Sequence, residues 1–257
     1  MPIAKVNGVD LYYEETGQGF PLVWSHEFGG DHRSWEPQVR YFGRRYRVVT
    51  YNHRGYPPSE VPKDANAYSQ DALIEDLHQL LLRLGIRHAH ICGCSMGANV
   101  ALNFALAHPA MTKSVVVVGG GAGTVAREQF VSRQGATADA LEREGIESDA
   151  ALLPAEGPAG VGGVRRLHPR ALARGVRASD PRRHAAAAHG HPDRAAAARA
   201  ACADAGDRRR RGRALVPGAG LLVVPRTGHT VNIEEPGLFN LHVAEFLAAV
   251  EQNRWAP

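Results

Sequence analysis

The chain has 257 residues, of which 44% are hydrophobic, and this is enough to build one sizeable core in one main domain. The three cysteines give no disulfide framework, which favours a reducing, cytoplasmic setting. No apolar run approaches the length of a membrane span, and the N-terminus lacks the apolar core of a signal peptide. We therefore expect a cytoplasmic protein that does not enter a membrane.

Charge is distributed unevenly along the chain. The formal net charge is +4, but residues 161–220 contain fourteen Arg and four Asp, a local charge of +10, which leaves −6 for the remainder. Clustered Arg is typical of phosphate binding. However, this tract has no aromatic residue on which a base could stack, so we expect no specific nucleic-acid partner.

In the first 121 residues, short apolar runs alternate with segments of helical periodicity. Strands are predicted at residues 3–15, as a hairpin about Asn7 and Gly8, and at 21–25, 47–51, 86–92 and 113–118. Helices are predicted at residues 35–46, at 68–84 with Gly85 as the stop, and from Ser95 to Pro109. Because the strands are apolar runs rather than alternating patterns, they favour a mostly parallel sheet covered by helices on both faces, an α/β fold.

The second half of the chain changes character at about residue 149. Residues 122–149 contain helix-like segments, but from there to residue 217 Ala, Arg, Gly, His and Pro dominate and no helical or strand periodicity survives. Recognisable secondary-structure patterns return after this tract. Residues 220–224 are predicted as a buried strand and residues 236–250 as a helix. The expected apolar face of that helix consists of Leu238, Leu241, Phe246, Leu247 and Val250.

The most specific motif is Gly93-Cys94-Ser95-Met96-Gly97, which lies between a predicted strand and a predicted helix. In this context Gly-x-Ser-x-Gly is typical of a nucleophile elbow, a strained turn that raises the serine hydroxyl above the sheet edge. Side chains at Gly93 and Gly97 would collide with neighbouring backbone, and the N–H of Met96 would face a developing oxyanion. An ordinary glycine-rich turn is the alternative.

A second loop, at residues 26–30, reads His-Glu-Phe-Gly-Gly and follows the strand predicted at 21–25. A His and glycines between a strand and a helix are where a second oxyanion donor would be mounted, and a plain Gly-Gly loop is the alternative. The loop at residues 52–59 is rich in turn residues and is expected to be structural.

A nucleophilic serine needs a base, and His229 is the best candidate among the thirteen histidines. It follows a predicted strand, stands beside a glycine and precedes the last helix. His184, His189 and His191 belong to the biased tract and have no Cys partners at ligand spacing, so no metal site is expected.

With the Ser95 elbow and the loops at 26–30, 52–56 and 228–236, the sequence resembles the α/β-hydrolase superfamily over residues 3–121 and 218–253. It looks closest to the cofactor-free bacterial branch of enol-lactone hydrolases, carbon–carbon bond hydrolases and small esterases. The resemblance implies a core formed by residues 1–121 and 201–257, with a lid or cap at 122–200.

The resemblance also implies a serine hydrolase that needs no cofactor and acts on a small ester, lactone or activated ketone through an acyl-enzyme. Ser95 would attack the carbonyl, and His229 would accept its proton and later activate water. The N–H groups of Phe28 and Met96 would hold the oxyanion. Serine at the nucleophile position argues against the dehalogenase and epoxide hydrolase branches. The alternative is a catalytically impaired or inactive member, and the oligomeric state stays open.

Two features depart from the family pattern. Glu27 stands where glycine is usual, which places a carboxylate near the oxyanion hole. It would favour a cationic or hydroxyl-bearing substrate or pair with an Arg, and the second is the expectation. The triad acid is missing from its usual place, because only Asp204 and Asp207 are available there and neither follows an apolar run.

One hypothesis accounts for both the missing acid and the biased tract. Residues 201–214 can be encoded with high-GC codons so that reading one base later gives Arg-Ala-Pro-Thr-Leu-Val-Ile-Val-Gly-Asp-Glu-Asp-Glu-Pro. That peptide is an apolar strand followed by a loop that resembles the acid loop of the family. We therefore interpret residues 150–216 as a frame-shifted translation of the lid and the acid strand, with an Arg-rich lid as the alternative.

The nucleotide sequence of codons 145–220 tests this hypothesis. We expect the third-position base bias of the gene to move to another codon position inside the tract, because the original frame would still carry that bias. Clean reads with ordinary third-position bias throughout would contradict the frame shift. The Arg-rich lid would then be the remaining explanation of the tract.

Overall fold

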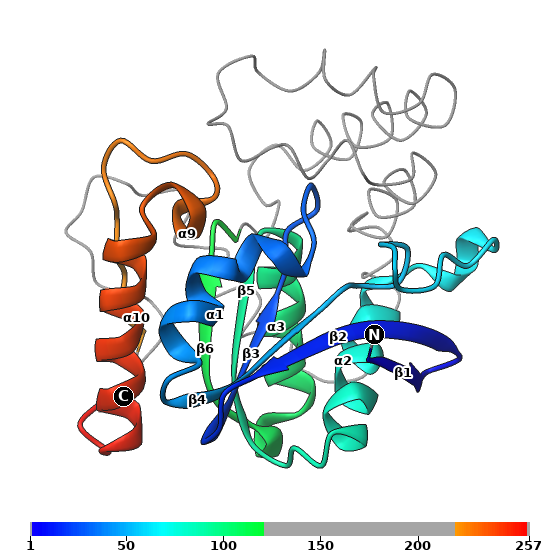
Figure 1. Cartoon of the computed structure of the whole chain (residues 1–257), viewed down its shortest axis with the longest axis horizontal. Coiled ribbons are helices and arrows are strands. Elements are labelled where there is room, and N and C mark those ends of the chain that lie inside the picture. The colour runs from blue at the N-terminus through cyan, green and yellow to red at the C-terminus, as the bar shows by residue number, and fades with distance from the viewer. Residues whose placement is uncertain (1, 121–218, 256–257) are drawn as a thin grey trace.

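The computed structural model describes residues 2–120 and 219–255, which are built around a central sheet (Figure 1). The six described strands have the order β1-β2-β4-β3-β5-β6. They are β1 (Ile3–Val6), β2 (Val9–Thr16), β3 (Phe20–Ser25), β4 (Tyr46–Tyr51), β5 (Ala89–Cys94) and β6 (Thr112–Val118). β2 pairs antiparallel with β1 and β4, and all other neighbours are parallel. This confirms the expected α/β fold, whereas the domain boundaries expected after residues 121 and 200 lie outside the described residues.

Helices cover both faces of the sheet, as the sequence predicts. They are α1 (Glu36–Phe42), α2 (Gln70–Arg83), α3 (Met96–Ala107), α9 (Val231–Glu234) and α10 (Pro236–Glu251), with short 3₁₀ turns η1 (His32–Trp35), η2 (Ala65–Ala67) and η3 (Pro109–Met111). α2 and α3 lie on one face, and α1 and α10 lie on the other (Figure 1). In the described ranges, no helix combines the length and apolar character needed to cross a membrane.

Local sequence sets both ends of α2. Ser69 precedes the helix, and its hydroxyl accepts a hydrogen bond from the N–H of Ala72 at 3.0 Å, a side-chain N-cap. Gly85 follows the last turn with a φ of 69°, and the next N–H, of Ile86, donates to the carbonyl of Leu81 at 2.8 Å. This closing turn needs a left-handed residue, so Gly85 ends the helix where the sequence predicts.

The core forms one layer on each face of the sheet. Successive residues of a strand point to opposite faces, so Val23 packs toward α2 and α3 while Leu22 and Trp24 pack toward α1 and α10. The Trp24 ring lies 4.5 Å from that of Trp35 and 6.1 Å from that of Phe239, measured between centroids. This aromatic group holds the C-terminal helix against the N-terminal part of the chain.

Residues 220–224 do not form the buried strand that the sequence predicts. Their backbone is irregular, and Leu221 and Val223 are 67% and 74% exposed. A strand needs a neighbour for its hydrogen bonds, and β6 is the last strand of the described sheet, with no described strand on its outer side. An apolar run alone is therefore not sufficient to form this strand.

The buried face of α10 also differs from the predicted one. Leu247 is buried as predicted, but Phe239, which is not part of the predicted face, is also buried, whereas Leu238 and Leu241 are 38% and 49% exposed. Because Phe239 packs against the rings of Trp24 and Trp35, the helix is turned so that the two leucines point away from the core.

A buried ion pair joins the loop after β4 to α2. Arg54 Nε donates to Asp76 Oδ2 at 2.6 Å, its Nη2 donates to Oδ1, and both side chains are at most 5% exposed. Arg54 Nη1 also donates to the carbonyl of Ala67 at 2.7 Å, and Asn7 Nδ2 donates to Asp76 at 2.9 Å. The two charges satisfy each other, so this pair holds the loop, the first hairpin and α2 together.

Replacing Asp76 by alanine would leave the Arg54 guanidinium buried without its counter-charge. We expect Asp76→Ala to lower the free energy of unfolding by about 3–5 kcal/mol, measured by urea denaturation. The control is Asp71→Ala, at an exposed position in the first turn of the same helix, which should cost less than about 1 kcal/mol. Equal losses in the two variants would contradict the importance of the pair.

Candidate active site

Ser95 lies at the turn between β5 and α3. Its φ of 52° and ψ of −111° are values that residues with a side chain rarely adopt. The Ser95 N–H donates to the carbonyl of Val118 at 2.9 Å, which fixes the turn against the end of β6. The residue is half-buried, so the hydroxyl is held at the carboxyl edge of the parallel strands and remains within reach of a ligand.

The two glycines of the motif allow this turn because other backbone atoms occupy the space of their missing side chains. A Cβ built on Gly93 would lie 2.1 Å from the carbonyl oxygen of Gly97, and a Cβ built on Gly97 would lie 2.1 Å from that of Ser25. These distances confirm the collisions expected from the sequence. The start of α3 therefore lies directly against the end of β3.

The loop at residues 26–30 is tied to the loop at 52–59 through the ring of His26. His26 Nε2 accepts a hydrogen bond from the N–H of His53 at 3.1 Å, so the ring proton is on Nδ1, which donates to the carbonyl of Glu27 at 2.7 Å. Complete burial lowers the pKa of His26 to about 4, so this neutral ring persists at neutral pH. The backbone that carries the expected oxyanion donor is thereby fixed.

Tyr56 contacts both residues whose N–H groups are expected to hold an oxyanion. Its hydroxyl donates to the carbonyl of Phe28 at 3.1 Å and lies 3.8 Å from the sulfur of Met96. Its ring packs edge-on against His26, with centroids 4.7 Å apart. In the sequence, this loop is expected to be structural and residues 52–56 carry part of the family resemblance, but neither observation assigns a role to Tyr56.

Glu27 is a buried residue of the loop at 26–30, and among the described residues it lacks the Arg partner that the sequence predicts. Its Oε1 accepts a hydrogen bond from the hydroxyl of Ser34 at 2.7 Å, and in the described part of the chain it makes no ion pair with an Arg. Its Oε2 is buried without a hydrogen-bond partner among the described residues. Burial raises the pKa of Glu27, so the carboxyl keeps its proton to a higher pH than an exposed glutamate does.

His229 lies in the loop before α9, close to the end of β6. A Cβ built on Gly119, the residue after β6, would lie 3.1 Å from Nδ1 of His229. The thiol of Cys94 lies 3.9 Å from the His229 carbonyl, to which it donates a long hydrogen bond. His229 and Ser95 therefore share one edge of the sheet. In the described ranges no hydrogen bond joins the Ser95 hydroxyl to the His229 ring. Catalytic hydrogen bonds are often long or poorly aligned when no substrate is bound.

Glu234 holds the His229 loop from both sides. Its Oε2 accepts a hydrogen bond from the N–H of Gly228 at 2.5 Å, and its Oε1 accepts bonds from the N–H and the hydroxyl of Thr230, both at 3.2 Å. The Gly228 hydrogen bond is the largest cause of the lowered pKa of Glu234, which keeps the carboxylate ionised. The sequence motif includes Glu234 but does not reveal this positioning role, which depends on the short α9 turn.

The acid that would orient His229 is not among the described residues. Asp204 and Asp207 lie outside them, as does the tract interpreted as frame-shifted. Within the described ranges no carboxylate accepts a hydrogen bond from the His229 ring, and Glu234 bonds the backbone on either side of it instead.

Comparison with known proteins matches this geometry to one family. A family model described as "alpha/beta hydrolase fold" matches residues 21–147. The structure of a thermophilic esterase from Thermogutta terrifontis superposes with a TM-score of 0.78, over 97% of this chain and 99% of that chain, at 21% sequence identity. The chain has the α/β-hydrolase fold.

Two curated relatives match part of this chain. Epoxide hydrolase 3 of Mus musculus is 31% identical over 137 residues, which cover 52% of this chain and 37% of the relative. 3-oxoadipate enol-lactonase 1 of Acinetobacter baylyi is 34% identical over 125 residues, which cover 49% and 44% of the two chains. The matched part is thus less than half of the length of either relative.

The close backbone contact at Gly97 predicts a strong effect of one methyl group. In Gly97→Ala the new Cβ would meet the Ser25 carbonyl, so α3 must shift, and we expect a loss of at least about 2 kcal/mol in the free energy of unfolding. The control is Gly237→Ala in the first turn of α10, where a Cβ meets nothing within 4 Å. There alanine should be neutral or stabilise the protein by about 0.5–1 kcal/mol, measured by thermal or urea denaturation. Similar effects at both positions would contradict the contact.

Proposed function

We propose that this α/β hydrolase is a serine hydrolase that cleaves a small ester, lactone or activated ketone through an acyl-enzyme. Ser95 Oγ attacks the carbonyl carbon, and its proton passes to His229. The N–H groups of Phe28 and Met96 stabilise the negatively charged oxygen. The bond to the leaving group breaks, and that group takes the proton from His229. Water activated by His229 then releases the acid and restores Ser95.

The backbone conformation of Ser95 is the observation that carries the proposal. A φ of 52° at a residue with a side chain costs on the order of 1–3 kcal/mol, and a plain connection between a strand and a helix does not require it. The strain brings a half-buried hydroxyl to the carboxyl ends of parallel strands, where ligands bind in open α/β sheets. This combination favours a nucleophile over a simple turn residue.

The chemistry of the site narrows the choice between the activities that the relatives' names describe. One relative is named an enol-lactonase and another an epoxide hydrolase. The N–H groups of Phe28 and Met96 suit a carbonyl oxygen that becomes negatively charged, and a lactone or ester has such an oxygen whereas an epoxide has none. Serine rather than aspartate at position 95 also favours the carbonyl substrate.

A catalytically impaired member of the superfamily is the second candidate. It is favoured by the exposure of Leu221 and Val223, which leaves apolar surface at a segment where the sequence predicts a buried strand. Such a protein would keep the fold and the small-molecule site without efficient turnover.

A fluorophosphonate probe distinguishes the two candidates, because it reacts covalently with activated serine hydroxyls. We expect the folded chain to be labelled once, at Ser95, and Ser95→Ala to abolish labelling. His229→Gln should slow labelling by roughly 10²–10⁴-fold, because the serine then lacks its base. Gel fluorescence and intact-protein mass provide the measurement.

The matched control is Ser69→Ala, which removes the N-cap of α2 and leaves the elbow intact. Its labelling rate should equal that of the unmodified chain. A sample that unfolds cooperatively on heating but is not labelled would sink the serine hydrolase proposal and favour the impaired protein.

A further inference from the structure

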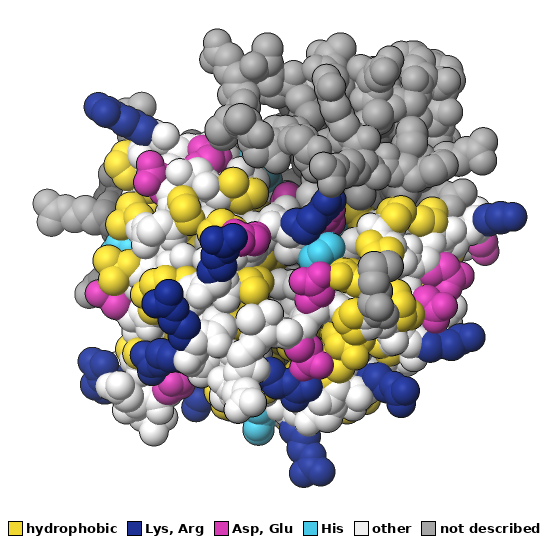
Figure 2. All heavy atoms as spheres, in the orientation of Figure 1, with side chains coloured by type: hydrophobic (Ala, Val, Ile, Leu, Met, Phe, Trp, Pro, Cys, Tyr) yellow, Lys and Arg dark blue, Asp and Glu magenta, His cyan; other side chains and the backbone are white. Residues whose placement is uncertain are grey.

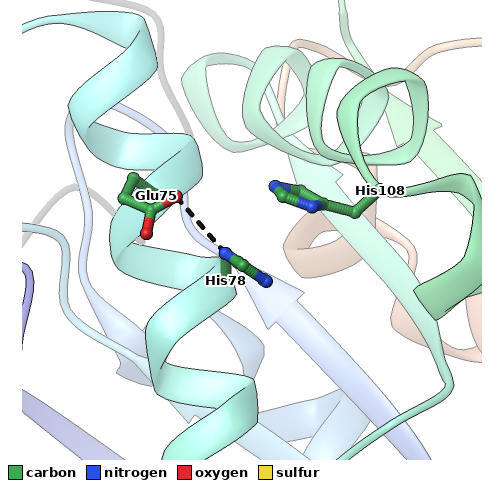
Figure 3. A group of neighbouring side chains, drawn as sticks. All are labelled: Glu75, His78 and His108. Atoms are coloured by element: carbon green, nitrogen blue, oxygen red, sulfur yellow. Dashed lines mark hydrogen bonds and ion pairs between the residues drawn. The ribbon is translucent and has the colours of Figure 1, made fainter.

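Three side chains with metal-binding chemistry meet between α2 and the end of α3. Glu75 and His78 project from the middle of α2, and His108 follows the last residue of α3 (Figure 3). One ligand atom from each side chain lies within 4.8 Å of the other two. All three residues are half-buried, so solvent reaches the group.

The backbone holds these side chains in place. Glu75 and His78 are three residues apart on one helix and therefore share a face, with 3.3 Å between Glu75 Oε2 and His78 Nδ1. The His108 N–H donates to the carbonyl of Phe104 at 2.7 Å, and the His108 carbonyl accepts a hydrogen bond from the Thr112 hydroxyl at 3.1 Å. The ring of His108 consequently lies against that of His78, with centroids 4.0 Å apart and planes 19° from parallel.

We propose that Glu75, His78 and His108 bind one divalent transition-metal ion, with Zn²⁺ the best fit, and that this ion joins α2 to the end of α3. Two imidazoles and one carboxylate form a ligand set that Zn²⁺ accepts in proteins. The half-buried position leaves a fourth site for water. The inference does not depend on the proposed hydrolase activity, because it concerns other residues and another part of the fold.

The ligand atoms have to move only a short way to reach bonding geometry. Zn²⁺ bonds of about 2.0–2.2 Å in a tetrahedron place ligand atoms roughly 3.3–3.5 Å apart. The atoms now lie within 4.8 Å of one another, so the widest separation closes by at most about 1.5 Å. The rings of His78 and His108 must also tilt out of their stacked arrangement so that one nitrogen of each points at the same ion. Rotation about side-chain bonds provides this movement without a shift of either helix.

The carboxylate is already prepared for a cation. Glu75 Oε1 accepts a hydrogen bond from Gln79 Nε2 at 2.8 Å, which leaves Oε2 on the side of His78. A hydrogen bond that orients a ligating carboxylate is a common feature of metal sites.

The place of the group in the fold indicates a structural ion rather than a catalytic one. Ser95 precedes the first residue of α3 and His108 follows the last, so the twelve helical residues separate them by about 18 Å. The metal would link two helices on the same face of the sheet at the end opposite to the elbow.

The chain contains a matched control for this site. His242 and Glu245 on α10 are also three residues apart on one helix, with 3.6 Å between Nδ1 and Oε2. They belong to no group of three potential ligands among the described residues. A His–Glu pair of this kind has too few ligands to bind Zn²⁺ tightly, so it tests whether the third ligand matters.

Isothermal titration calorimetry of the full metal-free chain with Zn²⁺ alone tests the proposal. We expect the unmodified chain to bind one more equivalent of Zn²⁺ than His108→Gln does, or to bind that equivalent more than roughly tenfold more tightly. His78→Gln and Glu75→Gln should weaken the same equivalent, and His242→Gln should not. Every variant keeps all other histidines, so binding elsewhere in the chain is common to all of them.

Thermal unfolding with and without Zn²⁺ provides the second readout. Zn²⁺ should raise the melting temperature of the unmodified chain and of His242→Gln, and this rise should be lost in the three site variants, because only a folded site binds the ion. If one site variant does not fold, the other two still decide the question. Equal Zn²⁺ stoichiometry and affinity in the unmodified chain and the folded site variants would overturn the proposal.

Discussion

The close backbone contact between α3 and the sheet is the constraint on which the candidate site depends. Gly97 meets the carbonyl of Ser25, and Gly93 meets the carbonyl of Gly97, at distances that leave no room for a side chain. α3 therefore begins directly at the carboxyl edge of β3 and β5, and Ser95 between the two glycines takes a positive φ. The core layer between α2, α3 and the sheet stabilises this strained turn, because moving α3 would disturb that packing.

Buried polar groups then fix the loops around the turn. The neutral ring of His26 connects two loops through one donated and one accepted hydrogen bond, and Tyr56 connects the Phe28 carbonyl to the Met96 side chain. In a low-dielectric interior each such group is costly without its partner, so the hydrogen bonds select one loop arrangement. His53 and Glu27 are exceptions, because Nδ1 of His53 and Oε2, one oxygen of Glu27, are buried without a partner among the described residues. That oxygen lies on the same loop as the expected oxyanion donor.

The C-terminal segment completes the carboxyl edge of the sheet, where Ser95 lies, through two different contacts. Phe239 docks α10 against the Trp24 and Trp35 rings, and Glu234 holds the loop that carries His229. Neither contact requires residues 220–224 to join the sheet, which explains how α10 packs well although the preceding segment is exposed. α3 is thus constrained at its first turn by glycine contacts, and the proposed metal would constrain it at its last.

Local sequence was enough to predict the features that depend on neighbours along the chain: the alternation of strands and helices, the Ser95 elbow and the stop at Gly85. Such features follow from backbone sterics and periodicity within a few residues. Three other features were not predictable from local sequence: residues 220–224 stay exposed, Tyr56 supports the site and His108 meets α2. These outcomes depend on contacts between segments far apart in the chain, and such contacts exist only after the helices pack on the sheet. Local patterns therefore predicted the turn, whereas packing decided its surroundings.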